Sequence, residues 1–160
     1  MNKISFCIPC YKSEQTIKKV VDEIELTMKE SGDQYEYEIV LVNDCSPDNT
    51  YEVIEQIANE NERVLGISLA KNFGQHAAIM AGLRNAVGDI VVYLDDDGQT
   101  PANEVFNLIN EIEAGQDVVY AKYKKPIIAN TVPVYVEIRR GVTLKAVNPF
   151  IHNVISLPIE

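Results

Sequence analysis

The stretch DIVVYLDDDG at residues 89–98 decides the fold of this chain. Its first part is a short, mostly β-branched apolar run, which is typical of a strand buried on both faces of a parallel sheet. Three carboxylates, Asp95, Asp96 and Asp97, follow directly at the end of that strand. Ligands of open parallel sheets bind beyond the carboxyl ends of the strands. We therefore expect a binding site at the edge of the sheet that carries these aspartates.

Similar apolar runs occur on both sides of this stretch, and segments with helical periodicity separate them. The predicted strands are Ile4–Ile8, Glu38–Val42, Val64–Leu69, Asp89–Leu94 and Asp117–Tyr120. Apolar spacing predicts four helices, at residues 17–28, 53–58, 74–86 and 105–112, with Ser13 as the N-cap of the first. This alternation predicts an α/β fold, a Rossmann-like and mostly parallel sheet with helices on both faces.

The composition of the chain changes near Pro126. A length of 160 residues with 46% apolar side chains fits one domain with a single core. Residues 126–160 carry three basic and two acidic side chains, whereas residues 1–125 carry 11 and 22. We therefore expect a domain at residues 1–125 and an atypical tail at residues 126–160 that packs on the domain or on a partner.

The formal net charge of −10 disfavours nucleic acid as a partner. An acidic protein that binds phosphate groups needs a cation between its carboxylates and the phosphates. The amino-terminal apolar stretch is too short and wrongly flanked for a signal peptide, and no run approaches the ~20 apolar residues of a membrane span. The sequence predicts a cytoplasmic protein and leaves peripheral contact with the inner face of the membrane open.

The three cysteines, Cys7, Cys10 and Cys45, are an odd number, which disfavours a disulfide framework. Cys7 and Cys10 have the spacing of a redox or zinc motif. They lie within and just after an apolar strand, however, and no second pair or histidine cluster completes a metal site. We interpret them as structural residues.

Polar side chains also follow the other predicted strands. Asn43 and Asp44 follow the second strand and Asn72 follows the third, so they converge with Asp95 and Asp97 on one edge. Consecutive carboxylates repel one another, and Mg²⁺ or Mn²⁺ relieves that repulsion while leaving coordination positions for a diphosphate. The alternative is that the aspartates are solvated loop residues that cap the next helix.

Three further residues each have two interpretations. Asp44 could accept a hydrogen bond from a nucleobase or a ribose, or could cap the helix that begins near Asp48. Tyr11 could stack on a base or cover the start of the first helix. Lys71 could neutralise a phosphate or lie on the surface.

Four segments together resemble a known family. They are IPCYKSE at residues 8–14, VNDCSPDNT at 42–50, KNFGQHAA at 71–78 and LDDDGQTP at 94–101. In this order they are similar to motifs of the inverting family 2 glycosyltransferases of GT-A fold. The resemblance is greatest to bacterial polyprenyl-phosphate sugar transferases and dolichol-phosphate mannose synthase-like enzymes, and it covers about residues 3–125.

The resemblance implies a nucleotide-sugar-binding domain at residues 1–125 that transfers a sugar from a UDP- or GDP-linked donor. The acceptor would be a lipid phosphate or a saccharide, and the cofactor Mg²⁺ or Mn²⁺. Pro9, Tyr11 and Asp44 would line the nucleobase pocket, and Asp97 with Asp95 would hold the metal. The full set of implied substrate contacts is Pro9, Tyr11, Glu14, Asp44, Lys71, Asp95 and Asp96.

Two departures from the family pattern stand out. Asn43 stands where many relatives carry another aspartate, and residues 126–160 show no acceptor-side catalytic acid or arginine-rich loop. The catalytic residue therefore stays unknown, and a non-catalytic nucleotide-binding or interaction module of the same fold is the alternative. A receiver-type signalling domain fits less well because Lys71 and Asn72 follow the third strand. A Rossmann dehydrogenase is excluded because no glycine-rich fingerprint follows the first strand.

Overall fold

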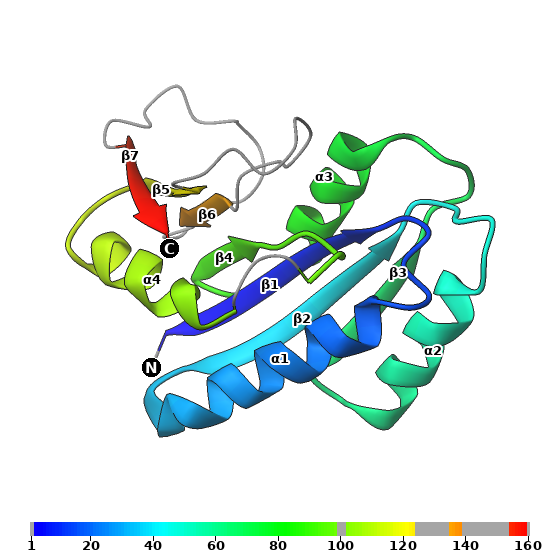
Figure 1. Cartoon of the computed structure of the whole chain (residues 1–160), viewed down its shortest axis with the longest axis horizontal. Helices are drawn as coiled ribbons and strands as arrows, with labels where there is room; N and C mark the ends of the chain where they lie inside the picture. Colours follow the sequence, from blue (N-terminus) through cyan, green and yellow to red (C-terminus); the bar gives the residue numbers. More distant parts are fainter. Residues whose placement is uncertain (1, 99–101, 124–134, 139–153, 160) are drawn as a thin grey trace.

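The computed structural model describes residues 2–98, 102–123, 135–138 and 154–159. Strands and helices alternate along most of this part of the chain (Figure 1). The strands are β1 (Lys3–Cys10), β2 (Glu36–Asn43), β3 (Val64–Ser68), β4 (Ile90–Tyr93), β5 (Val118–Tyr123), β6 (Tyr135–Ile138) and β7 (Val154–Ile159). The helices are α1 (Ile17–Glu30), α2 (Thr50–Glu60), α3 (Gln75–Asn85) and α4 (Val105–Glu113), with short 3-10 turns η1 (Gly32–Gln34) and η2 (Ala102–Glu104).

All seven strands form one sheet in the order β3-β2-β1-β4-β6-β5-β7. The first four strands of the chain are parallel to one another, and β5 is parallel to β7. The exception is β6, which is antiparallel to both β4 and β5. The five predicted strands and four predicted helices are confirmed within a few residues. The strands β6 and β7 were not predicted, and the division of the chain at residue 125 stays a prediction.

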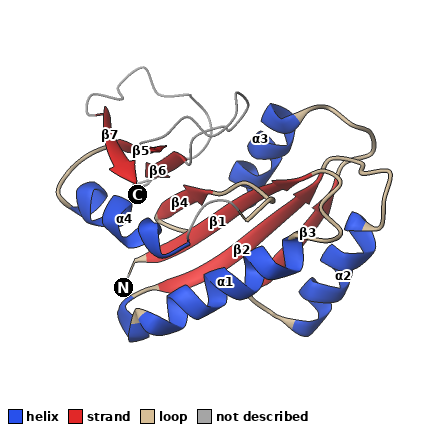
Figure 2. Ribbon diagram, viewed as in Figure 1, coloured by secondary structure: helices blue, strands red, loops and turns tan. Residues whose placement is uncertain are grey.

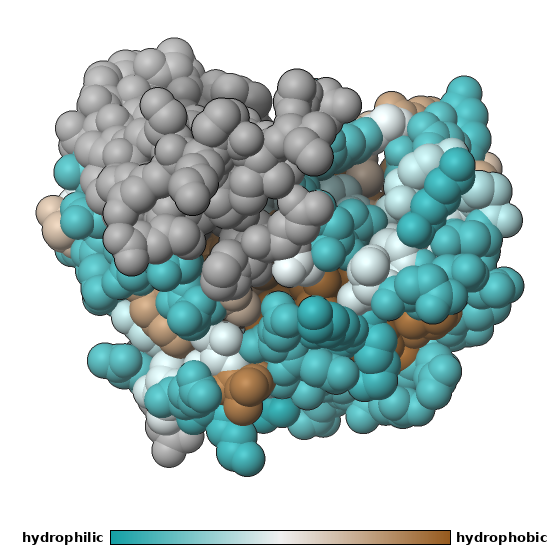
Figure 3. All heavy atoms as spheres, viewed as in Figure 1, coloured by the Kyte–Doolittle hydropathy of each residue, from teal (hydrophilic) through white to brown (hydrophobic). Residues whose placement is uncertain are grey.

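Helices cover both faces of the sheet, as the apolar spacing predicts (Figure 2). The helices α1, α2 and α4 pack on the face that carries Phe6 and Ile8, and α3 packs on the face that carries Cys7 and Val40. The outer sides of α1 and α2 are mostly hydrophilic (Figure 3). Within the described residues, no helix has both the length and the apolar character that crossing a membrane requires.

The predicted N-cap of the first helix is wrong. The N-cap residue of α1 is Thr16, which makes no side-chain capping bond. Ser13 instead contributes its backbone carbonyl, which accepts hydrogen bonds from the N–H groups of Thr16 and Ile17 at 3.0 Å each. The chain makes one additional turn before the helix begins, because the loop that contains Ser13 is bound to a neighbouring loop.

A partly buried hydrogen-bond network around Glu38 fixes β4 against β1 and β2. Glu38 Oε1 accepts hydrogen bonds from Ser5 Oγ at 2.5 Å and from Val87 N–H at 2.7 Å, and Lys3 Nζ lies 2.9 Å from Oε2. Gly88 N–H donates to Ser5 Oγ, and a Cβ at Gly88 would lie 2.7 Å from the Lys3 carbonyl oxygen. Only glycine permits this approach, which places β4 and the aspartates that follow it.

The hydrogen bonds of this network lower the pKa of Glu38. Burial alone would raise the pKa, but the hydrogen bonds from Ser5, Val87 N–H and Lys3 outweigh burial and leave the pKa below its ordinary value. A carboxylate of this kind stabilises the fold above the unfolded-state pKa of about 4.3. That contribution disappears as the pH falls through the folded-state pKa.

We expect Glu38→Gln to lower the free energy of unfolding at neutral pH by about 1–3 kcal/mol, because the hydrogen bonds lose their charge assistance. The difference between the variant and the unsubstituted protein should shrink as the pH is lowered toward about 3, since Glu38 itself becomes protonated. Urea titrations followed by circular dichroism measure both effects. Glu36→Gln, at an exposed position of the same strand, is the control. A difference that is constant with pH would contradict this account.

Candidate functional site

A cleft of about 350 Å³ opens at the carboxyl ends of the strands, where the aspartates were expected. It is built from the ends of β1 and β2, the loop before α3, the first turn of α3 and the loop after β4. Its lining residues are Pro9, Cys10, Tyr11, Asp44, Asn72, Gly74, Gln75, Ala78 and Asp96. A larger hollow of about 870 Å³ lies near the amino ends of β1 and β2, lined by Lys3, Tyr37 and Arg63 among others. We assign the site to the cleft, because parallel sheets bind ligands at the carboxyl edge.

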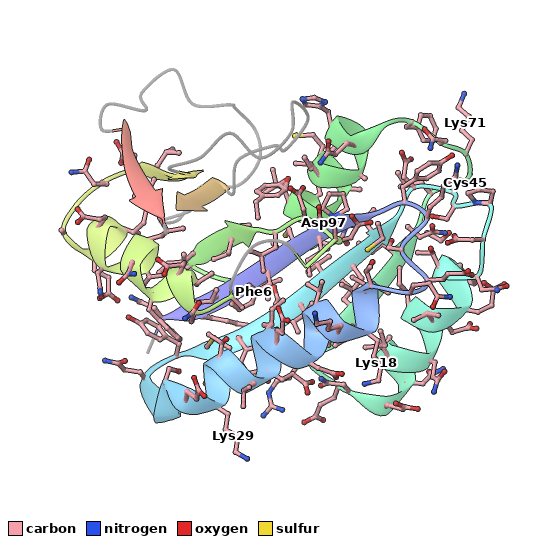
Figure 4. The ribbon with its side chains drawn as sticks, viewed as in Figure 1. Phe6, Lys18, Lys29, Cys45, Lys71 and Asp97 are labelled. Atoms are coloured by element: carbon pink, nitrogen blue, oxygen red, sulfur yellow. The ribbon has the colours of Figure 1, made fainter. Side chains whose placement is uncertain are left out.

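The cleft brings together four of the predicted site residues, Pro9, Tyr11, Asp44 and Asp96. The other four, Glu14, Lys71, Asp95 and Asp97, are outside its lining among the described residues. Lys71 extends away from the sheet, and its Nζ lies 4.9 Å from the centre of the Phe73 ring (Figure 4). Asp97 lies nearer the centre of the molecule, just after β4 (Figure 4).

Asp44 is almost fully buried, at 3% exposure, and holds the loop before α3. Its Oδ1 accepts a hydrogen bond from Phe73 N–H and its Oδ2 accepts one from Gly74 N–H, both at 2.8 Å. Gly74 is the N-cap of α3 and has φ of 89°, a conformation that glycine adopts readily. The carboxylate charge therefore lies at the amino terminus of α3, where the helix dipole stabilises it. Asp44 does not cap α2, whose N-cap is Asn49.

Tyr11 and Asp96 connect β1 to the aspartates after β4. Tyr11 N–H donates to Asp96 Oδ2 at 2.9 Å. The Tyr11 side chain is 46% exposed at the cleft, and Lys12 Nζ lies 5.5 Å from the centre of its ring. An exposed ring beside a cleft can stack on a planar ligand.

The ionised form of Asp95 is disfavoured by burial and by neighbouring charges. Burial, followed by the charges of Asp97 and Asp96, raises the pKa of Asp95 to about 6. Gln75 Nε2 donates a long hydrogen bond to Asp95 Oδ1 at 3.4 Å. A divalent cation held by Asp95 and Asp97 would relieve this repulsion, so the residues present fit a metal ion.

The described residues contain no group of three or more histidine, cysteine, aspartate or glutamate side chains that could hold a metal ion by themselves. Mg²⁺ commonly takes one or two carboxylates from a protein and completes its shell with waters and phosphate oxygens. The pair Asp95 and Asp97 is consistent with that kind of site.

Five cleft residues were not predicted as contacts, and they are Cys10, Asn72, Gly74, Gln75 and Ala78. Asn72 was expected at this edge without an assigned role, and Gly74 and Gln75 lie in a quoted segment at the start of a predicted helix. The place of Cys10 in the cleft could have been expected from its position at the end of β1. Burial, then the charge of Asp96, raises the pKa of the Cys10 thiol well above its ordinary value, so the thiol stays neutral.

The two close cysteines are structural, as interpreted from the sequence. Cys7 and Cys10 are both buried thiols. They pack in different clusters on opposite faces of the sheet, because positions three apart on a strand point in opposite directions. They cannot share a metal ion or form a disulfide in this strand.

Known proteins share sequence and fold with this chain. The family described as glycosyl transferase family 2 matches residues 5–152, which extends beyond the segment of resemblance seen in the sequence. An undecaprenyl-phosphate 4-deoxy-4-formamido-L-arabinose transferase of Proteus mirabilis is 41% identical over 120 residues, 74% of this chain and 36% of that protein. A Pseudomonas fluorescens protein of the same name is 38% identical over 117 residues, 72% of this chain and 34% of that protein. The chain thus spans about a third of the length of these relatives.

Two solved structures share the fold. S. aureus TarS 1-349 in complex with UDP has a TM-score of 0.63 and 26% identity, over 82% of this chain and 38% of that one. The mannosyltransferase PcManGT from Pyrobaculum calidifontis, in complex with GDP-Man and Mn²⁺, has a TM-score of 0.65. Its identity is 22%, over 77% of this chain and 36% of that one, so it supports the fold alone. The predicted GT-A fold and the family resemblance are confirmed.

We expect Asp44→Ala to lower the free energy of unfolding by about 1–3 kcal/mol, because the partly buried Phe73 N–H loses its acceptor and the Gly74 N–H keeps only Asn72 Oδ1, at 3.1 Å. The Phe73 and Gly74 amides should exchange hydrogen faster, which exchange followed by mass spectrometry measures. Asp22→Ala is the control, since it removes an exposed aspartate of α1 paired with Lys18 at 2.8 Å and should cost less than about 0.5 kcal/mol. Unchanged exchange at Phe73 and Gly74 would show that Asp44 does not hold the loop.

Proposed function

This chain belongs to glycosyl transferase family 2, and on that premise we propose that it is the donor-binding part of a metal-dependent glycosyltransferase. The donor is a sugar linked to UDP or GDP, and the acceptor is a lipid phosphate. The observation that carries the proposal is the cleft at the carboxyl edge, where Tyr11 and Asp44 lie with Asp96, the middle one of three consecutive aspartates.

Each residue of the cleft has a task in this proposal. The exposed ring of Tyr11 stacks on the base, and Pro9 contributes apolar lining. Asp44 keeps free lone pairs on its carboxylate oxygens and accepts a hydrogen bond from a base N–H. Asp95 and Asp97 hold Mg²⁺ or Mn²⁺, which supplies charge stabilisation of the departing nucleoside diphosphate when bound.

The transfer is a displacement at the anomeric carbon of the sugar. The acceptor oxygen forms a bond to that carbon as the bond to the diphosphate oxygen breaks, and the nucleoside diphosphate departs. A lipid phosphate suits this reaction because its attacking oxygen is already ionised, so no general base is needed. The inverted configuration of the product rests on the family resemblance.

The names of the relatives support the lipid acceptor, since they are undecaprenyl-phosphate sugar transferases. The names of two fold neighbours include UDP and GDP-Man, and both nucleotides remain in the proposal. The proposal with a lipid acceptor includes contact of the protein with the inner face of the membrane. A saccharide acceptor and a non-catalytic nucleotide-binding module are the alternatives that the experiment separates.

Calorimetric titration of the chain with UDP, GDP and their sugar conjugates, with and without Mn²⁺, tests the proposal. We expect metal-dependent binding that Asp97→Ala weakens at least about tenfold, because a metal ligand is lost. Asp22→Ala, on the outer side of α1, should bind as the unsubstituted chain does. Failure of every nucleotide to bind under any metal condition would refute the donor site. Binding followed by sugar transfer to a polyprenyl phosphate supports the lipid acceptor, and binding without turnover supports the non-catalytic module.

A further inference from the structure

Two loops at the carboxyl edge are joined side by side. One follows β1 and the other follows β2, and four hydrogen bonds between backbone N–H groups and side chains connect them. These interloop hydrogen bonds run from Lys12 N–H to Ser46 Oγ (3.1 Å), Ser13 N–H to Thr50 Oγ1 (2.9 Å), Glu14 N–H to Asp48 Oδ2 (3.4 Å) and Asn49 N–H to Glu14 Oε2 (2.9 Å).

The interloop hydrogen bonds hold two strained turns. Lys12 has φ of 59° and Cys45 has φ of 51°, and they are the two non-glycine residues with positive φ in the described part of the chain. Each lies two residues beyond the end of its strand, β1 or β2. A residue other than glycine keeps this backbone conformation only when the surrounding contacts hold it there.

The residues immediately before these turns are the cleft residues Tyr11 and Asp44. Each strained turn therefore sets the direction of a residue that lines the cleft. Of the four interloop hydrogen bonds, three are accepted by side chains of the second loop. Glu14 provides the acceptor in the opposite direction, and its side chain is half-buried outside the cleft lining.

The Asp44 N–H donates to the Cys10 carbonyl at 3.0 Å, which sets the spacing of the two strand ends. We propose that Glu14 is a positioning residue that fixes how the turns beyond these strand ends orient Tyr11 and Asp44 in the cleft. This replaces the substrate contact that the family resemblance implies for Glu14, and the nature of the ligand rests on the proposed function. Glu14 Oε2 accepts a hydrogen bond from Asn49 N–H, and its Oε1 accepts a weaker one from Gln15 Nε2 at 3.4 Å. Both carboxylate oxygens therefore bond to residues of the two loops. Without the Asn49 bond the loops populate other arrangements, and the apparent affinity falls with the fraction that is competent to bind.

Glutamine and alanine separate the two roles of Glu14. Glu14→Gln keeps an oxygen acceptor for Asn49 N–H and removes the charge, whereas Glu14→Ala removes both. We expect Glu14→Gln to bind UDP or GDP with Mn²⁺ within about twofold of the unsubstituted chain, and Glu14→Ala to bind about tenfold more weakly. Glu55→Ala, at an exposed position of α2, is the matched control and should bind normally. Equal weakening in the glutamine and alanine variants would overturn the proposal, because it would indicate that the charge contacts the ligand.

Hydrogen exchange tests the same inference without any ligand. Glu14→Ala should speed exchange of the Asn49 amide and of residues 11–16, and Glu14→Gln should leave it near the unsubstituted rate. Unchanged exchange in Glu14→Ala would overturn the positioning role even if nucleotides bind. If exchange responds as expected and no nucleotide binds the unsubstituted chain, the donor site fails while the loop connection stands.

Discussion

The parallel register of β1 with its two neighbours is the constraint on which the site depends. It pairs Cys10 with Asn43 on one side and Cys7 with Tyr93 on the other. Three strands therefore end close together, and their loops expose backbone N–H groups that the sheet no longer satisfies. Acidic side chains supply the acceptors, with Asp44 bonded to the loop before α3 and Asp96 bonded to Tyr11 N–H. The pairing register of β1 thus determines which carboxylates lie close together. Several of their oxygens accept hydrogen bonds from backbone N–H groups of the protein.

Asn43 stands where many relatives carry an aspartate, and its hydrogen bonds show how this difference can leave the local structure unchanged. Its Nδ2 donates to Ser68 Oγ at 3.1 Å and its Oδ1 accepts the Ser46 N–H at 3.0 Å. The amide therefore connects β2 to β3 and to its own following loop, and it needs both a donor and an acceptor. An aspartate there would keep the acceptor, and the Ser68 hydroxyl could donate to the other oxygen. Either residue satisfies the same two partners.

The sequence predicts well those features that depend on local periodicity and poorly those that depend on long-range pairing. The apolar runs determine β1, β2 and β4 because most of their residues are buried. The edge strand β3 was also predicted, although only Val64 of its residues is buried. The helix α3 was placed from Gly74 to Ala86, which are its observed N-cap and C-cap. The strands β6 and β7 were missed because nothing local identifies their partners, and β6 enters antiparallel between β4 and β5. The N-cap role of Ser13 was misjudged for the same reason, since its partner Thr50 lies beyond β2. The bond that Glu14 accepts from Asn49 N–H also joins separate loops and has no local sequence signal.

The carboxylates at this edge divide into two kinds with different physical consequences. Those of Asp44, Asp48 and Glu14 accept backbone N–H groups and stabilise the loops in one arrangement. Asp95 instead has a pKa raised to about 6 by burial and by its neighbours, so its ionised form destabilises the fold at neutral pH. Any cation that binds there stabilises the folded state by the free energy of its own binding. Because Asp95, Asp96 and Asp97 are consecutive in the chain, their repulsion cannot be avoided by separation, and a bound divalent cation would relieve it.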